Sequence, residues 1–143
     1  MVNKTQQKVC SMIKLYTSNS SLSSRKARNW LTQHKVDFQE INITSAHLSK
    51  EAFFHILSLT ETGTSDIISK RTLLYRELAP IWDDLTLNEI FEYIVENPVL
   101  LKKPLIFDEN KLQIGFNSDD IRMFLPKEFR IAEKNLFVNS DSN

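Results

Sequence analysis

One stretch near the start of the chain, residues 15–31, constrains the fold more than any other. An apolar/polar alternation from Ile13 to Tyr16 is typical of a half-buried strand, and a polar turn rich in serine follows it. The next segment has a helical period, with an apolar side formed by Ala27, Trp30, Leu31 and His34. Ser20 and Ser21 can accept hydrogen bonds from the first free N–H groups of that helix. The sequence therefore predicts a strand, a serine turn and a helix in direct succession.

The serine turn lies where a thiol enzyme would hold its reactive cysteine. A helix N-terminus stabilises a thiolate and lowers its pKa, but this turn contains only Asn19, serines and Leu22. Serine forms no anion at neutral pH without a base, and no histidine lies near the turn in the sequence. The fold could bring a histidine to it, but we interpret all three as ordinary surface or partly buried residues because none has metal or triad spacing: His34, His47 and His55.

Composition favours one folded domain without nucleotide chemistry. The chain has 143 residues, 41% of them hydrophobic and 25% charged, and no apolar run approaches the roughly 20 residues of a membrane helix. Lys and Arg balance Asp and Glu at 18 each, so any basic surface must be local. With only two glycines, Gly63 and Gly115, no Gly-rich phosphate loop can form. The single cysteine, Cys10, fits a cytoplasmic protein and is interpreted as an incidental thiol in an extension over residues 1–11.

The order of patterns predicts an α/β fold with a helical insertion. We expect one domain over 1–143, with a sheet part at about 12–47 and 98–130, a helical insertion at about 48–97, and polar ends. The second strand is expected from Val36 to Ile43. A helix is expected from Ser69 to Leu78, stopped by Pro80. Thr86 and Glu89 have capping-box spacing before the last helix of the insertion.

After the insertion, the sequence predicts a hairpin and a short helix. Residues 104–107 and 111–114 read as two strands joined through residues 108–110. Asn117 can cap a helix whose apolar residues pack inward, namely Ile121, Phe124 and Leu125. A further helix is possible in the tail that contains Phe129, Ile131, Leu136 and Phe137.

Charged clusters leave two interpretations open. Three basic groups could each be a solvated face or part of a recognition surface: Arg25, Lys26 and Arg28, then Lys70 and Arg71, then Lys102 and Lys103. The acidic pairs Asp83–Asp84 and Asp119–Asp120 are interpreted as solvated charges, because neighbouring side chains on a chain point apart.

Several motifs, taken in order, resemble the Spx family of thioredoxin-fold transcriptional regulators, which are relatives of arsenate reductase. They are Leu15-Tyr16-Thr17-Ser18, Arg25-Lys26-Ala27-Arg28, Thr60-Glu61-Thr62-Gly63-Thr64, Ile67-Ile68-Ser69, Glu96-Asn97-Pro98, Leu101-Lys102-Lys103-Pro104, Leu112-Gln113-Ile114-Gly115-Phe116 and Asp120-Ile121-Arg122 with Phe124-Leu125-Pro126. The resemblance covers most of the chain. Where the family commonly has Cys-x-x-Cys, this chain has Ser21-Leu22-Ser23-Ser24.

The resemblance implies a thioredoxin-like small mixed sheet with a helical insertion, and a cis Pro104 facing the Ser21 turn. It also implies a cytoplasmic regulator that binds the C-terminal domain of the RNA polymerase α subunit and reaches DNA only through polymerase. The matching motifs place five residues at that surface or in its support: Tyr16, Ser18, Gly63, Arg71 and Lys103. At position 103 the family often has Arg, whose bidentate contacts Lys cannot reproduce.

The serines at the redox positions, Ser21 and Ser24, imply that the disulfide switch is absent and that the chain is not an enzyme. We expect no cofactor, no metal, no membrane association and a monomer. Two other hypotheses stay open at this point. One is an inactive relative of thiol oxidoreductases or arsenate reductases, and the other is a generic protein-interaction scaffold.

Overall fold

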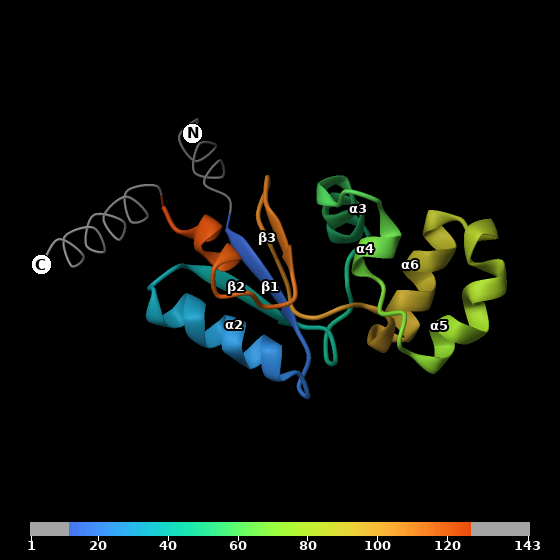
Figure 1. Ribbon diagram of the computed structural model, residues 1–143, viewed down its shortest axis with the longest axis horizontal. Helices are drawn as coiled ribbons and strands as arrows, with labels where there is room; N and C mark the ends of the chain where they lie inside the picture. Colours follow the sequence, from blue (N-terminus) through green and yellow to red (C-terminus); the bar gives the residue numbers. More distant parts are fainter. Residues whose placement is uncertain (1–11, 127–143) are drawn as a thin grey trace, which may run out of the picture.

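The computed structural model of the protein describes residues 12–126 and contains a four-stranded mixed sheet (Figure 1). The strands are β1 (Ile13–Thr17), β2 (Phe38–Asn42), β3 (Leu105–Phe107) and β4 (Leu112–Ile114). They lie in the order β2-β1-β3-β4, with β1 parallel to β2 and β3 antiparallel to both of its neighbours. A parallel strand–helix–strand unit followed by a hairpin confirms the predicted thioredoxin-like α/β fold.

Helix α2 (Leu22–Gln33) follows β1 directly, as predicted. Ser21 is its N-cap, and the Ser21 Oγ accepts a hydrogen bond from the Ser24 N–H at 3.0 Å. Ala27 and Leu31 are fully buried against one face of the sheet. The other two residues of the predicted apolar side, Trp30 and His34, stack on each other with ring centroids 3.8 Å apart and are only half buried.

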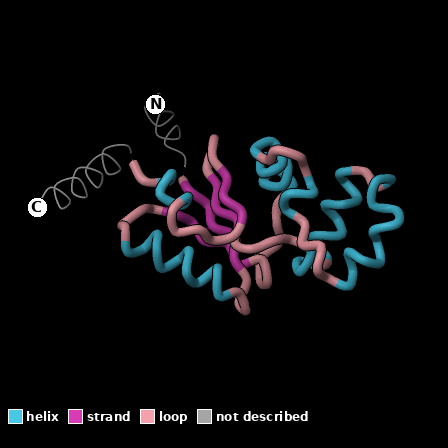
Figure 2. Tube along the Cα trace, viewed as in Figure 1, coloured by secondary structure: helices cyan, strands magenta, loops and turns pink. Residues whose placement is uncertain are grey.

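The insertion between β2 and β3 is helical, as predicted, and extends away from the sheet (Figure 2). Its elements are α3 (Lys50–Leu59), α4 (Thr64–Ile67), α5 (Leu73–Leu78), the 3-10 helix η1 (Ala79–Asp84), α6 (Leu87–Glu96) and the 3-10 helix η2 (Pro98–Leu100). Thr86 and Glu89 form the predicted capping box at the start of α6, with bonds of 3.1 and 2.8 Å.

The predicted helix from Ser69 to Leu78 is wrong at its start, whereas its end at Leu78 is confirmed. Residues 67–69 are tied to residues 100–102 instead: Ile68 bridges Leu101, and the Ser69 N–H donates to the Leu100 carbonyl at 2.7 Å. Helix α5 therefore begins only after its N-cap, Thr72. Pro80 does not stop the helical path, because it lies in the first turn of η1, where its missing N–H has no helical partner to lose.

Apolar side chains form one cluster on each face of the sheet. Leu15 and Ile106 point to the face covered by α2 and the 3-10 helix η3 (Asp120–Phe124), whereas Tyr16 and Leu105 point to the insertion. This explains the pattern of the second strand, in which Phe38 and Ile41 fall on opposite faces. Both faces of β2 therefore have apolar neighbours. The strand is shorter than the predicted 36–43.

The hairpin of β3 and β4 and the cap of η3 agree with the sequence. The Asn117 Oδ1 accepts from the N–H groups of Asp119 and Asp120 at 2.8 and 2.9 Å, and Ile121, Phe124 and Leu125 are buried. The peptide bond between Lys103 and Pro104 is cis, as the family resemblance implied.

In residues 12–126 no helix is long and apolar enough to cross a membrane. Cys10 and the predicted tail helix lie outside the described residues.

Candidate partner-binding site

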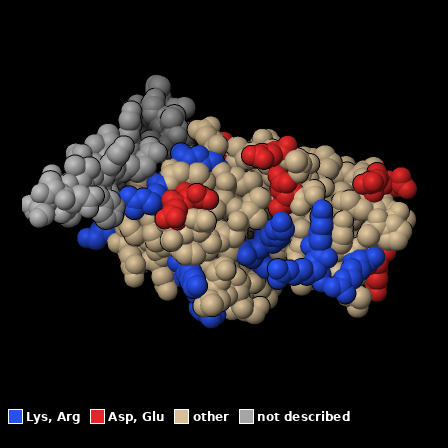
Figure 3. All heavy atoms as spheres, viewed as in Figure 1, with Lys and Arg blue, Asp and Glu red and all other residues tan. Residues whose placement is uncertain are grey.

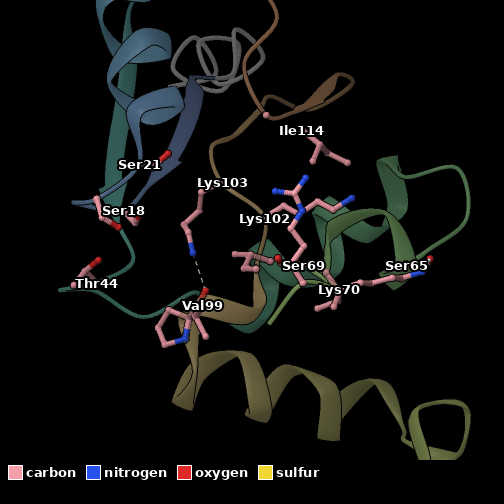
Figure 4. A pocket seen from close by; sticks show the side chains of 16 residues that line it. Ser18, Ser21, Thr44, Ser65, Ser69, Lys70, Val99, Lys102, Lys103 and Ile114 are labelled. Carbon is pink, nitrogen blue, oxygen red and sulfur yellow. Dashed lines mark hydrogen bonds between the residues drawn. The ribbon is translucent and has the colours of Figure 1, made fainter. Parts of the chain in front are cut away.

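An open cavity of about 1020 Å³ lies where the serine turn meets the insertion (Figure 4). Ser18 and Ser21 reach it from the turn, Arg71 from the segment before α5, and Lys103 from the segment before β3. These four predicted site residues are far apart in the sequence. The pairing of residues 67–69 with residues 100–102 is what brings the last two segments to one wall.

The cavity is basic, and none of the described residues that line it is acidic. Its lining includes four cations, Lys70, Arg71, Lys102 and Lys103, and six residues with hydroxyl groups, Ser18, Ser20, Ser21, Thr44, Ser65 and Ser69. In the view of Figure 3, Lys and Arg side chains gather over the insertion and its junction with the sheet. A molecule without net charge therefore has a local positive surface, as its balanced composition required of any basic site.

Lys103 is the most enclosed of these cations. Its Nζ donates a hydrogen bond to the Pro98 carbonyl at 3.0 Å (Figure 4). Burial lowers the pKa of the Lys103 ammonium. Among the described residues, it forms no ion pair. A half-buried ammonium loses part of its hydration, and a single carbonyl replaces only some of the lost hydrogen bonds. A negative group of a binding partner would therefore stabilise the charged form of Lys103.

The serines of the turn are engaged in the backbone of the turn itself. Ser24 is completely buried, and its Oγ accepts from the Ser18 N–H at 3.4 Å. The Ser21 hydroxyl caps α2 and remains partly accessible to the cavity. Two hydroxyls occupied in this way stabilise the turn, and neither has a base beside it among its hydrogen-bond partners.

Arg28 and Glu40 form a bidentate ion pair between α2 and β2. The Arg28 Nε–Glu40 Oε1 distance is 2.7 Å and the Arg28 Nη2–Glu40 Oε2 distance is 2.6 Å. The Glu40 Oε2 also accepts from the Thr17 hydroxyl at 2.8 Å, next to the serine turn. Hydrogen bonds from Arg28 lower the pKa of Glu40. Sequence reasoning missed this network, because no local pattern links residues 17, 28 and 40. Because Arg28 is held in this ion pair, it is not one of the freely accessible basic side chains of α2.

The other two residues predicted for the partner surface, Tyr16 and Gly63, do not line the cavity. Tyr16 is only 3% exposed, packs edge-on against Phe107, and has its pKa raised by burial. Gly63 is the N-cap of α4 with φ at +92°, and a Cβ at this position would meet no atom within 4 Å. Ser65, two residues further on, does line the cavity. Tyr16 can therefore only support the surface, whereas Gly63 lies two residues before the lining residue Ser65 in the chain.

The histidines and acidic pairs match the interpretations from sequence. His34 contacts the Trp30 carbonyl through Nδ1, and His55 contacts the Asp108 carbonyl through Nε2 at 2.8 Å. The four aspartates of the two acidic pairs are exposed. In the part of the chain that the structure describes, no group of His, Cys, Asp or Glu could hold a metal ion.

Fold and site together define a thioredoxin-like protein of the arsenate-reductase type. The chain matches the ArsC family over residues 16–124. It is 51% identical to global transcriptional regulator Spx 1 of Lactococcus lactis, covering 85% of this chain and 95% of that protein. It is 49% identical to global transcriptional regulator Spx of Streptococcus agalactiae, covering 85% and 89%. The solved structure of arsenate reductase from Vibrio cholerae has the same fold, with a TM-score of 0.66, 19% identity and coverage of 80% and 98%. The chain belongs to the Spx family, within the ArsC family.

Proposed function

We propose that this protein is a cytoplasmic transcriptional regulator that binds the C-terminal domain of the RNA polymerase α subunit. It acts as a monomer through protein contact, reaches DNA only through polymerase, and carries out no catalysis. The relatives named as global transcriptional regulators support the first part of this proposal. The choice of polymerase as the partner rests on the family resemblance.

The observation that carries the proposal is the gathering of Ser18, Arg71 and Lys103 at one cavity. These residues come from three separate segments, and each was assigned to the partner surface from its motif alone. The cavity is open, and all charged side chains in its described lining are basic, so these side chains would attract a protein partner that presents negative side chains. We assign Tyr16, which is buried, to the support of this surface, and Gly63, the N-cap of α4, to its border.

The proposal includes the absence of a disulfide switch. The chain has one cysteine, and serines occupy positions 21 and 24, so no disulfide can form within one chain. The same substitution opposes the alternative of a thiol oxidoreductase or arsenate reductase, because the nucleophile is missing.

A calorimetric titration with the purified α C-terminal domain of Lactococcus lactis tests the proposal. The test variant is Arg71→Glu, which reverses one exposed charge at the cavity. The matched control is Arg25→Glu, which reverses an exposed charge on α2 away from the cavity lining. We expect the first variant to weaken binding about tenfold or more and the second to change it little.

Two results would contradict the proposal. If the unaltered protein does not bind the α domain, the proposed partner is wrong. The hypothesis of a generic protein-interaction scaffold is then favoured. If both variants weaken binding equally, the attraction is general and the cavity is not the contact surface. A melting curve of each variant confirms that the fold is retained.

A further inference from the structure

The outer edge of the sheet has unused backbone hydrogen-bonding groups. Strand β4 lies at the end of the strand order, so β3 is its only neighbour in the sheet. The Asp108 N–H donates to the Lys111 carbonyl, and the Gly115 N–H donates to the Pro104 carbonyl. In an antiparallel ladder the bonded residues alternate, so Gln113 is bonded to β3 while Leu112 and Ile114 point their N–H and C=O groups outward. No hydrogen bond engages these four groups among the described residues.

A groove runs beside this edge. Its volume is about 640 Å³, and its walls are residues 112–117, Asp119 before η3, and Asp120 and Met123 of η3. The groove therefore continues the open edge into a space that a side chain can enter. The side chains of Leu112 and Ile114 are half buried against the cluster on the insertion side, so the strand itself is held firmly.

Two carboxylates, Asp119 and Asp120, line the groove. Asp119 and Asp120 are exposed, and neither forms an ion pair within residues 12–126. Their positions are set by the loop, because the Asn117 Oδ1 accepts from both of their N–H groups. That loop is tied to the strand in turn, since the Gln113 Oε1 accepts from the Asn117 N–H at 3.1 Å.

Natural sheets protect their edges with charges, proline or short strands, and β4 uses only its length of three residues. The strand Leu112–Ile114 contains no charge and no proline. Four backbone groups are too few to hold a peptide by themselves, so an occupant needs a further contact. The aspartates provide one for a positive side chain, and they would repel a second copy of this edge, which carries the same charges.

We propose that the edge of β4 is a docking site for an extended, positively charged peptide segment of a protein partner. The segment adds a fifth strand beside β4 and places a Lys or Arg side chain against Asp119 and Asp120. Alternate residues of the segment exchange hydrogen bonds with Leu112 and Ile114. Ile114 and Gly115 line both this groove and the basic cavity, so the two sites adjoin. Asp119 and Asp120 line only the groove, so the groove offers the charge that the described lining of the cavity lacks.

The probe is a synthetic capped hexapeptide of alternating valine and arginine, added to the isotopically labelled full chain. Two control peptides replace arginine by glutamate, or the central residues by proline, which has no N–H to donate. Amide hydrogen exchange reports the contact. We expect the arginine peptide to slow exchange at Leu112 and Ile114 and to leave Gln113 unchanged, because the Gln113 amide is already bonded to β3. Neither control peptide should do so.

The variant Asp119→Asn with Asp120→Asn tests the charge contact. It should weaken binding of the arginine peptide roughly three- to tenfold, as expected for two exposed ion pairs. The matched control, Asp83→Asn with Asp84→Asn, removes an exposed acidic pair from η1 and should leave affinity unchanged.

Three results would overturn the proposal. The first is failure of the arginine peptide to protect Leu112 and Ile114. The second is equal binding of the glutamate or proline peptide. The third is a dimer in sedimentation of the protein alone, with both amides already protected, because a second copy would then occupy the edge.

Discussion

Arg28 and Glu40 join α2 to β2 through two hydrogen bonds of 2.7 and 2.6 Å. The same carboxylate accepts from Thr17, the last residue of β1. The serine turn begins directly after Thr17, so this pair holds both ends of the turn: the strand that enters it and the helix that leaves it. The orientation of Ser18 and Ser21 at the cavity depends on that support.

Glu40→Gln should reduce stability more at neutral pH than in acid. The folded pKa of Glu40 is lowered by Arg28, so its contribution is complete above the unfolded pKa of glutamate, about 4.3, and is lost as the pH falls through the lower folded pKa. The side chains are 36% and 27% exposed, so solvent screening limits the loss to about 1 kcal/mol. Urea unfolding at pH 7 and in acid measures it. The exposed Glu92 provides a control as Glu92→Gln, and an equal loss in both variants would contradict the prediction.

Gly63→Arg and Gly63→Ala should lose similar stability but differ in partner binding. Both variants must place a Cβ at a φ of +92°, which costs about 1–2 kcal/mol, and the space around the Cβ is open. Only arginine adds a long charged side chain at the proposed border of the site. We expect Gly63→Ala to bind the α C-terminal domain and Gly63→Arg to lose it. Calorimetry at a temperature where both variants remain folded separates backbone strain, which lowers stability, from a side chain that blocks the partner. Normal binding by the arginine variant would show that Gly63 is not in the interface.

Lys103→Met should leave stability nearly unchanged while weakening the partner complex. Burial lowers the pKa of Lys103, so holding it charged costs folding free energy below that pKa, and the cost falls as the pH rises through it. Methionine removes this cost along with the hydrogen bond to the Pro98 carbonyl, so the two changes offset each other to within about 1 kcal/mol. Affinity for the α domain should drop several-fold. Thermal unfolding and calorimetry measure the two quantities, and unchanged affinity would show that Lys103 is only structural.

Oxidation should not change affinity for the α domain. Ser21 and Ser24 cannot form a disulfide, and Cys10 has no second cysteine within the chain. Binding measured in diamide should therefore equal binding in dithiothreitol at the same protein concentration. Cys10→Ser identifies any effect of disulfides between chains. A difference that persists in this variant would mean that oxidation acts through some other group.

Features that depend on residues a few positions apart were predictable from the sequence. The Ser21 cap, the capping box of Thr86 and Glu89, and the Asn117 cap each involve side chains within three residues of the groups they bind. The hairpin at residues 104–114 follows from two short apolar runs around a polar turn. Such interactions form wherever the local backbone permits them, so a single sequence determines them.

The site itself was decided by the tertiary structure. Helix α5 begins at Leu73 and not at the predicted Ser69, because Ile68 pairs with Leu101, a residue 33 positions away. The same pairing brings Arg71 and Lys103 to the cavity with Ser18, and the sheet buries Tyr16 rather than exposing it. Local periodicity contains no information about which distant segments meet, because that choice depends on burial and charge pairing across the whole chain. Sequence alone therefore determined the local elements and caps, and only the packing of the insertion against the sheet decided which basic residues share one surface.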